Sequence, residues 1–176
     1  MKVVLSGGGT GGHVNPALNI AKAIKKQDPT AEISFVGTKR GIESTLVPKA
    51  GYEIDFVEVQ GFRRKLNFKG LKENCKALYK AVASVHQAKK ILKERDPDVV
   101  VGTGGYVSWP TVKAASKLGI PCLIHEQNTF PGVTTKKLSK LANVVCISFE
   151  GSEKFFPAEA SEKLMLTGHP IHVDHI

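Results

Sequence analysis

The sequence predicts an α/β fold with a doubly wound, mostly parallel, Rossmann-like sheet and helices on both of its faces. Short β-rich runs alternate with segments whose apolar residues recur three and four positions apart, as strands alternate with helices. The strands are expected at residues 2–5, 32–36, 54–59, 99–101, 122–125, 144–148 and 164–166, and the helices at residues 17–26, 71–93, 111–118 and 136–141. Such sheets bind ligands beyond the carboxyl ends of their strands, so functional residues are expected directly after strands.

The composition fits one globular domain that spans residues 1–176, because 41% of the residues are hydrophobic and can form a core. Lys and Arg number 25 against 16 Asp and Glu, and the net charge of +9 favours an anionic partner. Nucleic acid, a phosphate ligand and an acidic membrane surface all fit this charge. No aromatic-rich basic motif accompanies the charge, so nucleic acid is not expected as a partner.

The cysteines and the N-terminus indicate the cellular compartment. Cys75, Cys122 and Cys146 are odd in number and lack metal-ligand spacing, so they are expected to be reduced and mostly buried, which favours the cytoplasm. The first residues form a short apolar strand followed by glycines, which is neither a signal peptide nor a spanning helix. Any membrane contact is therefore expected to be peripheral.

The first glycine loop follows the first predicted strand. Gly7, Gly9 and Gly12 match G-x-G-x-x-G, a pattern that brings backbone N–H groups and a helix N-terminus close to an anion. His13 at the mouth of this helix is a candidate general base, because histidine exchanges protons near neutral pH. The alternative is a histidine that only hydrogen-bonds the loop.

The same pattern occurs in dinucleotide-binding proteins, which place an acidic residue after the second strand to hold a ribose. The corresponding stretch here is Gly37-Thr38-Lys39-Arg40, which contains no acidic residue. NAD is therefore disfavoured. Lys39 and Arg40 are suited to the extra phosphate of NADP, so an NADP-binding reductase domain remains an alternative.

A second glycine loop follows the fourth predicted strand, at residues 102–105. Its sequence Gly-Thr-Gly-Gly leads into Tyr106, and Ser108 is expected to cap a helix before Pro110. Two such loops at one edge of a sheet can face one ligand. The alternative for this loop alone is a tight turn that needs positive φ angles.

A third strand end carries the polar residues His125, Glu126, Gln127 and Asn128 directly after an apolar run. Glu126 can orient or deprotonate a hydroxyl group, and Asn128 can bind a sugar or an amide. A capping role is the alternative for Asn128.

Two residue clusters resemble metal sites but are not expected to bind metal. Asp96-Pro97-Asp98 precedes its strand, so it should lie at the sheet edge opposite the glycine loops and serve as a connector. His169, His172 and His175 recur at three-residue spacing, but Pro170 disrupts the helix that would align them.

Six segments of the sequence resemble the MurG family of bacterial glycosyltransferases in order and spacing. They are GGGTGGHVNPAL, VGTKRGIE, VQGFRRK, PDVVVGTGGYVS, GIPCLIHEQN and PGVTTKKL. The resemblance implies the acceptor-binding N-terminal domain of a GT-B fold, with a C-terminal donor-binding domain that is absent from this chain. A stand-alone membrane-recruiting subunit of a split glycosyltransferase is an alternative.

The reaction implied by the resemblance is an inverting transfer of GlcNAc from UDP-GlcNAc in peptidoglycan synthesis. The acceptor is the MurNAc C4 hydroxyl of undecaprenyl-diphosphate-MurNAc-pentapeptide, so that lipid I becomes lipid II. The resemblance implies neither a cofactor nor a tightly bound metal. It places most of the UDP-GlcNAc site in the C-terminal domain, so this chain alone is expected to be inactive.

The resemblance also implies roles for individual residues. It implies catalytic roles for His13 and Glu126. It assigns Thr10, Gly11, Gly12 and Asn128 to the donor, and Gly9, Gly104, Gly105, Tyr106, Ser108 and Gln127 to the acceptor. One departure is that residues 167–172 read Thr-Gly-His-Pro-Ile-His, where the family pattern is Thr-Gly-Asn-Pro-x-Arg, so His172 replaces a donor-contacting arginine.

The predicted helix at residues 71–93 combines an apolar stripe with a basic face. Its expected membrane contacts are Lys69, Lys72, Lys76, Tyr79 and Lys80, because lysines meet anionic headgroups and exposed apolar groups insert shallowly. The resemblance places this contact at the cytoplasmic side of the bacterial cell membrane. The alternative is that the stripe packs on the sheet and the charged face is solvated.

Overall fold

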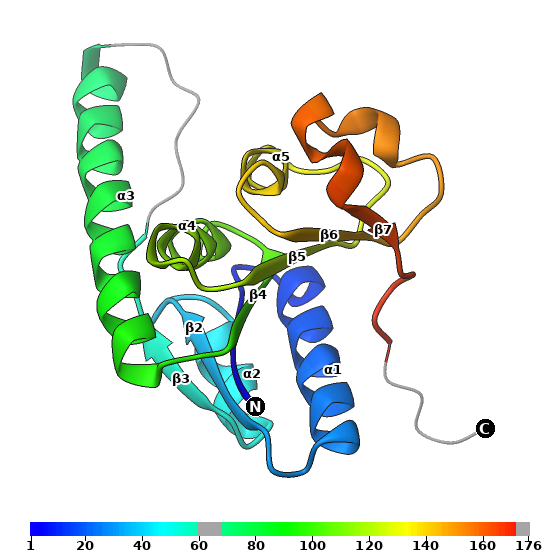
Figure 1. Cartoon of the computed structure of the whole chain (residues 1–176). Helices are drawn as coiled ribbons and strands as arrows, with labels where there is room; N and C mark the ends of the chain where they lie inside the picture. The colour runs from blue at the N-terminus through cyan, green and yellow to red at the C-terminus, as the bar shows by residue number, and fades with distance from the viewer. Residues whose placement is uncertain (60–67, 172–176) are drawn as a thin grey trace.

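The computed structural model describes residues 1–59 and 68–171, and the side chains of residues 68–79 lie outside the description. A seven-stranded sheet with the order β3-β2-β1-β4-β5-β6-β7 runs through the molecule (Figure 1), and every neighbouring pair is parallel. The strands are β1 (Lys2–Gly7), β2 (Glu32–Gly37), β3 (Glu53–Phe56), β4 (Val99–Gly104), β5 (Cys122–Glu126), β6 (Val144–Ile147) and β7 (Leu164–Leu166). The predicted doubly wound sheet and its seven strands are confirmed.

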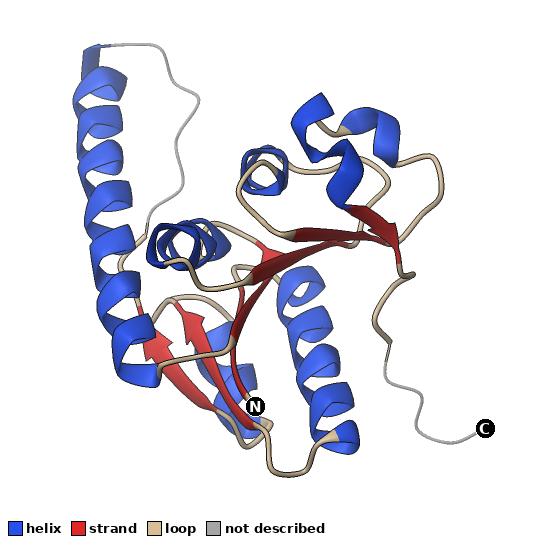
Figure 2. Ribbon diagram, in the orientation of Figure 1, coloured by secondary structure: helices blue, strands red, loops and turns tan. Residues whose placement is uncertain are grey.

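The helices lie on both faces of this sheet (Figure 2). They are α1 (Gly11–Gln27), α2 (Glu43–Lys49), α3 (Phe68–Arg95), α4 (Ser108–Leu118) and α5 (Val133–Ser139), followed by the 3₁₀ turns η1 (Glu153–Phe155) and η2 (Ala158–Lys163). The four predicted helices are confirmed, although α1 begins six residues earlier than residue 17. Helix α2 was not predicted, because it has only seven residues and contains Pro48.

Alternate residues of the central strands build two separate cores. Val3 and Leu5 of β1 pack with α1 and α2 on one face, whereas Val4 packs with α3, α4 and α5 on the other. Such double-sided burial explains why the strands read as continuous apolar runs. The sheet is therefore rigid on both sides at the point where its loops emerge.

The order of the strands brings the two glycine loops together. The chain moves outward from β1 to β2 and β3, then crosses back to place β4 on the other side of β1. The carboxyl ends of β1 and β4 are adjacent, with Ser6 paired with Gly102 and Gly7 with Gly104. This reversal is the topological switch point, where parallel α/β sheets bind ligands.

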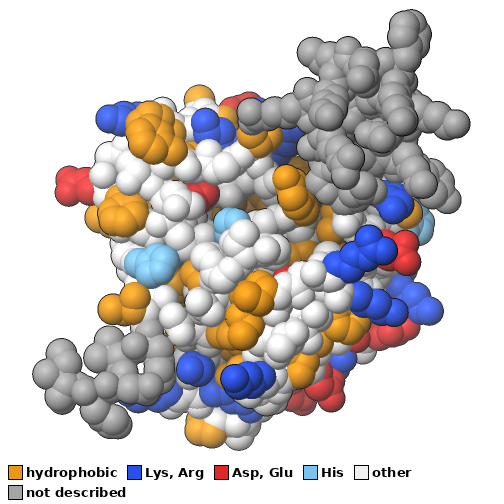
Figure 3. Space-filling view, turned by 180° about the vertical axis from the view of Figure 1, so that it is seen from behind, with side chains coloured by type: hydrophobic (Ala, Val, Ile, Leu, Met, Phe, Trp, Pro, Cys, Tyr) orange, Lys and Arg blue, Asp and Glu red, His pale blue; other side chains and the backbone are white. Residues whose placement is uncertain are grey.

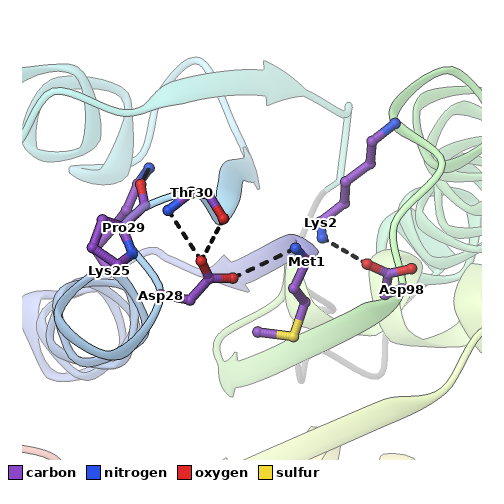
Figure 4. Close-up of polar contacts among 7 residues, drawn as sticks. All are labelled: Met1, Lys2, Lys25, Asp28, Pro29, Thr30 and Asp98. Atoms are coloured by element: carbon purple, nitrogen blue, oxygen red, sulfur yellow. Dashed lines mark hydrogen bonds and ion pairs between the residues drawn. The ribbon is translucent and has the colours of Figure 1, made fainter.

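The opposite edge of the sheet is closed by short polar contacts (Figure 4). The Asp98 carboxylate accepts the Lys2 backbone N–H at 2.7 Å, and the Asp28 carboxylate accepts from Thr30 and pairs with the N-terminal amine. The predicted position of Asp96-Pro97-Asp98, away from the glycine loops, is confirmed. A cavity of about 390 Å³ at this edge is lined in part by Lys2, Lys25 and Arg95.

Two of the three cysteines are free thiols in the interior. Cys122 and Cys146 are buried, and burial raises the pKa of each thiol. The Cys75 side chain lies outside the described residues. Within residues 1–59 and 68–171, no helix has both the length and the apolar content that a membrane span requires.

Candidate active site

The two glycine loops contact each other directly. The Gly8 N–H donates to the Gly104 carbonyl at 3.3 Å, and the Thr103 hydroxyl donates to the His13 carbonyl at 2.6 Å. A Cβ atom at Gly105 would lie 2.1 Å from the Gly8 carbonyl oxygen, so only glycine fits there. The predicted pairing of the loops at one sheet edge is confirmed.

His13 is held by packing on the second glycine loop. A Cβ atom at Gly104 would lie 2.5 Å from the His13 Nδ1 atom, which means that the imidazole rests on the glycine backbone. This Nδ1 atom is buried and has no hydrogen-bond partner among the described residues. The alternative of a histidine fixed by hydrogen bonds of this nitrogen to its own loop therefore does not fit the structure.

The first turn of α1 presents open backbone donors beside His13. Thr10 is the N-cap residue, is exposed, and its side chain makes no capping hydrogen bond. The N–H groups of Gly11 and Gly12 belong to the first turn, where a helix offers no internal acceptor. Added Cβ atoms at these two glycines would meet nothing nearer than 3.7 Å. Thr10, Gly11 and Gly12 are thus accessible to an anion.

The predicted acceptor contact of Gly9 cannot use its backbone N–H. Its N–H is donated to the Glu43 Oε2 atom at 2.9 Å and is not available to a ligand. Glu43, the first residue of α2, is only 1% exposed and was missed in the sequence. Its Oε1 atom accepts from the Thr38 N–H at 2.9 Å and from the Thr38 hydroxyl at 2.8 Å. An acidic residue therefore does follow β2, but it binds the protein's own loop.

The electrostatics of Glu43 favour an ionised carboxylate. Burial by itself raises the pKa of Glu43, but the hydrogen bonds from Gly9, from its own N–H and from Thr38 outweigh burial and lower the pKa overall. The N–H groups of Gly9 and Thr38 and the Thr38 hydroxyl compensate for the loss of water around the charge.

Ser108 also supports a loop, and its predicted contact with an acceptor is corrected. The side chain is fully buried, and its hydroxyl accepts the Gly104 N–H at 3.0 Å while facing the carbonyls of Ser6 and Gly104 at 2.8 Å. Ser108 is the first residue of α4, and Val107 occupies the capping position. By contrast, Tyr106 is 59% exposed at the surface of the second loop.

The strand end after β5 is held by its own side chains. The Glu126 carboxylate is 2% exposed and accepts from the N–H and the amide of Asn128 at 2.9 and 3.0 Å, and from the Gly132 N–H at 3.3 Å. Gln127 is buried and donates to the Nδ1 atom and the carbonyl of His125. The Glu126 carboxylate thus braces the 126–132 loop, and the Gln127 amide fixes His125. Proton transfer by Glu126 and acceptor contact by Gln127 stay predictions. Asn128 remains exposed.

His125 connects this strand end to the segment after β7. Its Nδ1 atom accepts from Gln127, so its Nε2 atom carries the proton that is donated to the Gly168 carbonyl at 2.9 Å. Burial, chiefly, lowers the pKa of His125, and the neighbouring His169 lowers it further. Among the described residues, no three His, Cys, Asp or Glu side chains form a metal-binding group. His172 and His175 lie outside the described residues.

The predicted membrane helix is only partly described. Figure 1 shows that the N-terminal turns of α3 extend beyond the sheet, but the side chains of Lys69, Lys72, Lys76 and Tyr79 lie outside the description. Lys80 is half-buried.

In the view from behind, Lys and Arg side chains lie around the margin of the face, whereas apolar side chains and a histidine lie nearer its middle (Figure 3).

The parallel sheet and the paired glycine loops at its switch point define the class: a Rossmann-like N-terminal domain of the GT-B type. Comparison with a solved structure agrees, because the chain matches the crystal structure of Acinetobacter baumannii MurG with a TM-score of 0.77 and 34% identity. The match covers 98% of this chain and 46% of that one. Residues 3–147 match the glycosyltransferase family 28 N-terminal domain, and the chain belongs to this family.

The curated relatives share one description, UDP-N-acetylglucosamine--N-acetylmuramyl-(pentapeptide) pyrophosphoryl-undecaprenol N-acetylglucosamine transferase. The relative from Clostridioides difficile (strain 630) is 54% identical over 171 residues, which are 97% of this chain and 41% of that protein. The relative from Thermoanaerobacter sp. (strain X514) is 52% identical over 171 residues, which are 97% of this chain and 45% of that protein. The chain therefore spans less than half the length of these relatives.

Proposed function

We propose that this chain forms the acceptor-binding half of an inverting glycosyltransferase that moves GlcNAc from UDP-GlcNAc to the MurNAc C4 hydroxyl of lipid I. The names of the curated relatives supply the two substrates. The structural observation that carries the proposal is His13, which stands at the N-terminus of α1 with its imidazole packed on Gly104. One side chain thus lies where the two glycine loops meet.

In the proposed reaction, His13 accepts the proton of the C4 hydroxyl as its oxygen attacks C1 of the sugar. The new C1–O bond forms while the bond from C1 to the UDP oxygen breaks, and attack from the opposite face inverts the anomeric centre. Negative charge on the diphosphate of the UDP leaving group is stabilised by the N–H groups of Gly11 and Gly12 and by the positive end of α1. Thr10 and Asn128 are exposed at the same edge and are proposed to contact the donor.

On the acceptor side, the proposal retains Gly104, Gly105 and Tyr106, because Tyr106 is exposed directly after the second loop. Glu126, Gln127 and Ser108 act indirectly by fixing the loops. No step requires a metal or a cofactor. A C-terminal domain is proposed to complete the donor site, and α3 is proposed to contact the anionic cytoplasmic face of the membrane peripherally.

Two experiments test this proposal. A water-soluble lipid I analogue titrated into the ¹⁵N-labelled chain should shift the amide signals of Gly104, Gly105 and Tyr106. Shifts confined to residues far from both loops would contradict the proposed site.

The second experiment measures transfer in a two-domain enzyme, in which the C-terminal part of the Clostridioides difficile relative follows this chain. His13→Ala should lower kcat by about 10²- to 10⁴-fold, the usual contribution of a general base, and change the acceptor KM much less. Lys117→Ala, at an exposed position of α4, is the control and should leave kcat unchanged. Unchanged turnover in His13→Ala would remove His13 as the base.

The NADP-dependent alternative is disfavoured by Glu43. Its carboxylate takes the Gly9 N–H, which is therefore not free for the pyrophosphate of a dinucleotide. A fluorescence titration with NADPH should therefore show no saturable binding.

A further inference from the structure

Glu43 is a buried charged group that the proposed reaction does not use. It is 1% exposed and accepts one hydrogen bond from the first glycine loop and two from Thr38. A buried carboxylate costs stability unless such partners compensate for the loss of water. A buried carboxylate bonded to the first glycine loop therefore suggests a role in holding that loop.

Three glycines make room for this side chain. A Cβ atom would lie 2.5 Å from the Glu43 carboxyl carbon at Gly8, 2.6 Å from the Glu43 Cγ atom at Gly37, and 2.1 Å from a carboxylate oxygen at Gly41. These glycines come from β2 and from the loops that follow β1 and β2. A Cβ atom at any one of these glycines would collide with the Glu43 side chain as it lies in the structure.

The hydrogen bond to Gly9 fixes how the chain enters α1. Gly9 has a φ angle of +83° and directly precedes the N-cap residue Thr10. On one side, the Gly8 N–H is tied to Gly104; on the other, the Gly9 N–H is tied to Glu43. With both ends of this turn held, the first turn of α1 and His13 keep one orientation toward the second loop.

We propose that Glu43 is a positioning residue for the transfer reaction: its carboxylate holds the first glycine loop so that the α1 N-terminus and His13 face the reacting groups. This inference rests on the function proposed above. Glu43 does not touch substrate, and it acts through the Gly9 backbone. Its loss should therefore reduce turnover more than substrate affinity, because a misplacement of about 1 Å in an active site costs about 10²-fold in rate.

The first test examines the loop itself, in this chain. In Glu43→Ala, the Gly9 amide proton should move upfield in ¹⁵N correlation spectra, since its hydrogen bond to a carboxylate is lost. Sodium acetate matches the atoms removed and should restore the signal, whereas sodium chloride at equal ionic strength should not. Glu43→Gln has no room for acetate and serves as the matched control. Thr38→Val, which keeps the Gly9 contact, should leave the Gly9 signal near its wild-type position.

The second test measures transfer in the two-domain enzyme. Glu43→Ala should lower kcat by about 10- to 100-fold with a smaller change in KM, and acetate should restore part of the rate. Glu43→Gln should lower kcat without rescue. A Glu43→Ala enzyme with wild-type kcat would overturn the proposal. So would a Glu43→Ala variant in which acetate restores neither the Gly9 signal nor the transfer rate.

The two tests also separate this inference from the proposed function. If acetate restores the Gly9 signal but the wild-type two-domain enzyme transfers no GlcNAc, the loop contact stands and the proposed function fails. If the wild-type enzyme is active and the Gly9 signal does not depend on Glu43, the positioning role fails and the proposed function stands.

Discussion

The two glycine loops have similar sequences but are held by different chemistry. The first loop is tied by the ionised carboxylate of Glu43, which reaches it from α2. The second loop is tied by the neutral hydroxyl of Ser108, which accepts the Gly104 N–H from four residues away. The first support is charged and distant in sequence, whereas the second is neutral and local.

The glycines themselves also fall into two groups. An added Cβ atom would lie 2.1 Å from a backbone oxygen at Gly105 and 2.5 Å from the Glu43 carboxyl group at Gly8, so these glycines allow close packing. At Gly11 and Gly12 an added Cβ atom would meet only ordinary contacts at 3.7 Å. The motif therefore combines glycines that allow the loops to pack with glycines that leave backbone donors accessible.

The largest effect is expected from Gly105→Ala. Its φ angle is +82°, and the new Cβ atom would lie 2.1 Å from the Gly8 backbone oxygen, so the loops must separate. We expect a loss of about 3 kcal/mol or more in the free energy of unfolding. Gly9→Ala is the control, because its φ angle is +83° but nothing lies within 4 Å of the added atom. It should cost about 1–2 kcal/mol. Equal costs in urea unfolding would argue against tight contact between the loops.

A second prediction separates the charged support from the neutral one by pH. Glu43→Gln should cost about 2–3 kcal/mol at pH 7, and Ser108→Ala about 1–3 kcal/mol, since each leaves a buried N–H without its acceptor. The pKa of Glu43 is lowered in the folded state, so its contribution is complete above the unfolded value of about 4.3 and is lost as pH falls through the folded value. Only the cost of Glu43→Gln should therefore shrink in acid. Chemical unfolding between neutral and acid pH measures both variants, and parallel pH profiles would contradict the assignment.

The smallest effect on stability is expected from Gly11→Ala. Gly11 lies in the first turn of α1 without steric conflict, and alanine favours helix by up to about 1 kcal/mol. Thermal unfolding should show unchanged or slightly higher stability, whereas the KM for UDP-GlcNAc in the two-domain enzyme should rise because the methyl group obstructs the approach to the N–H groups. Weakened folding with intact binding would reverse the division of the glycines.

Local patterns predicted much of this arrangement. The apolar runs located the strands, and the glycine motifs after residues 5 and 101 indicated that both loops share one edge, because parallel strands end on the same side. The same reasoning placed Asp98 at the other edge, where it accepts the Lys2 N–H. These predictions depend only on strand direction and on the side chains next to each strand end.

The supports of the loops could not be predicted in the same way. Glu43 lies in a short helix that contains Pro48, and its contact with Gly9 spans 34 residues. The resemblance assigned Ser108, Glu126 and Gln127 to the site, and Glu126 and Gln127 also follow a strand, but each side chain is buried. Position after a strand indicates proximity to a site, whereas the direction of a side chain depends on tertiary packing. The available signal for Glu43 was the pair of glycines just before it, Gly37 and Gly41, because a missing side chain leaves room for a neighbouring one.

The position of β1 between β2 and β4 has a consequence for the order of folding. Val3 pairs with Val99, so the pair of β1 and β4 joins residues separated by more than half of the chain. Such distant pairing is slow because loop closure must precede it. During synthesis at about 5–20 residues per second, β1 can pair with β2 well before β4 leaves the ribosome. Glu43 can therefore engage Gly9 while β1 still has an open edge, and the first glycine loop would receive its charged support before the second glycine loop has been synthesised.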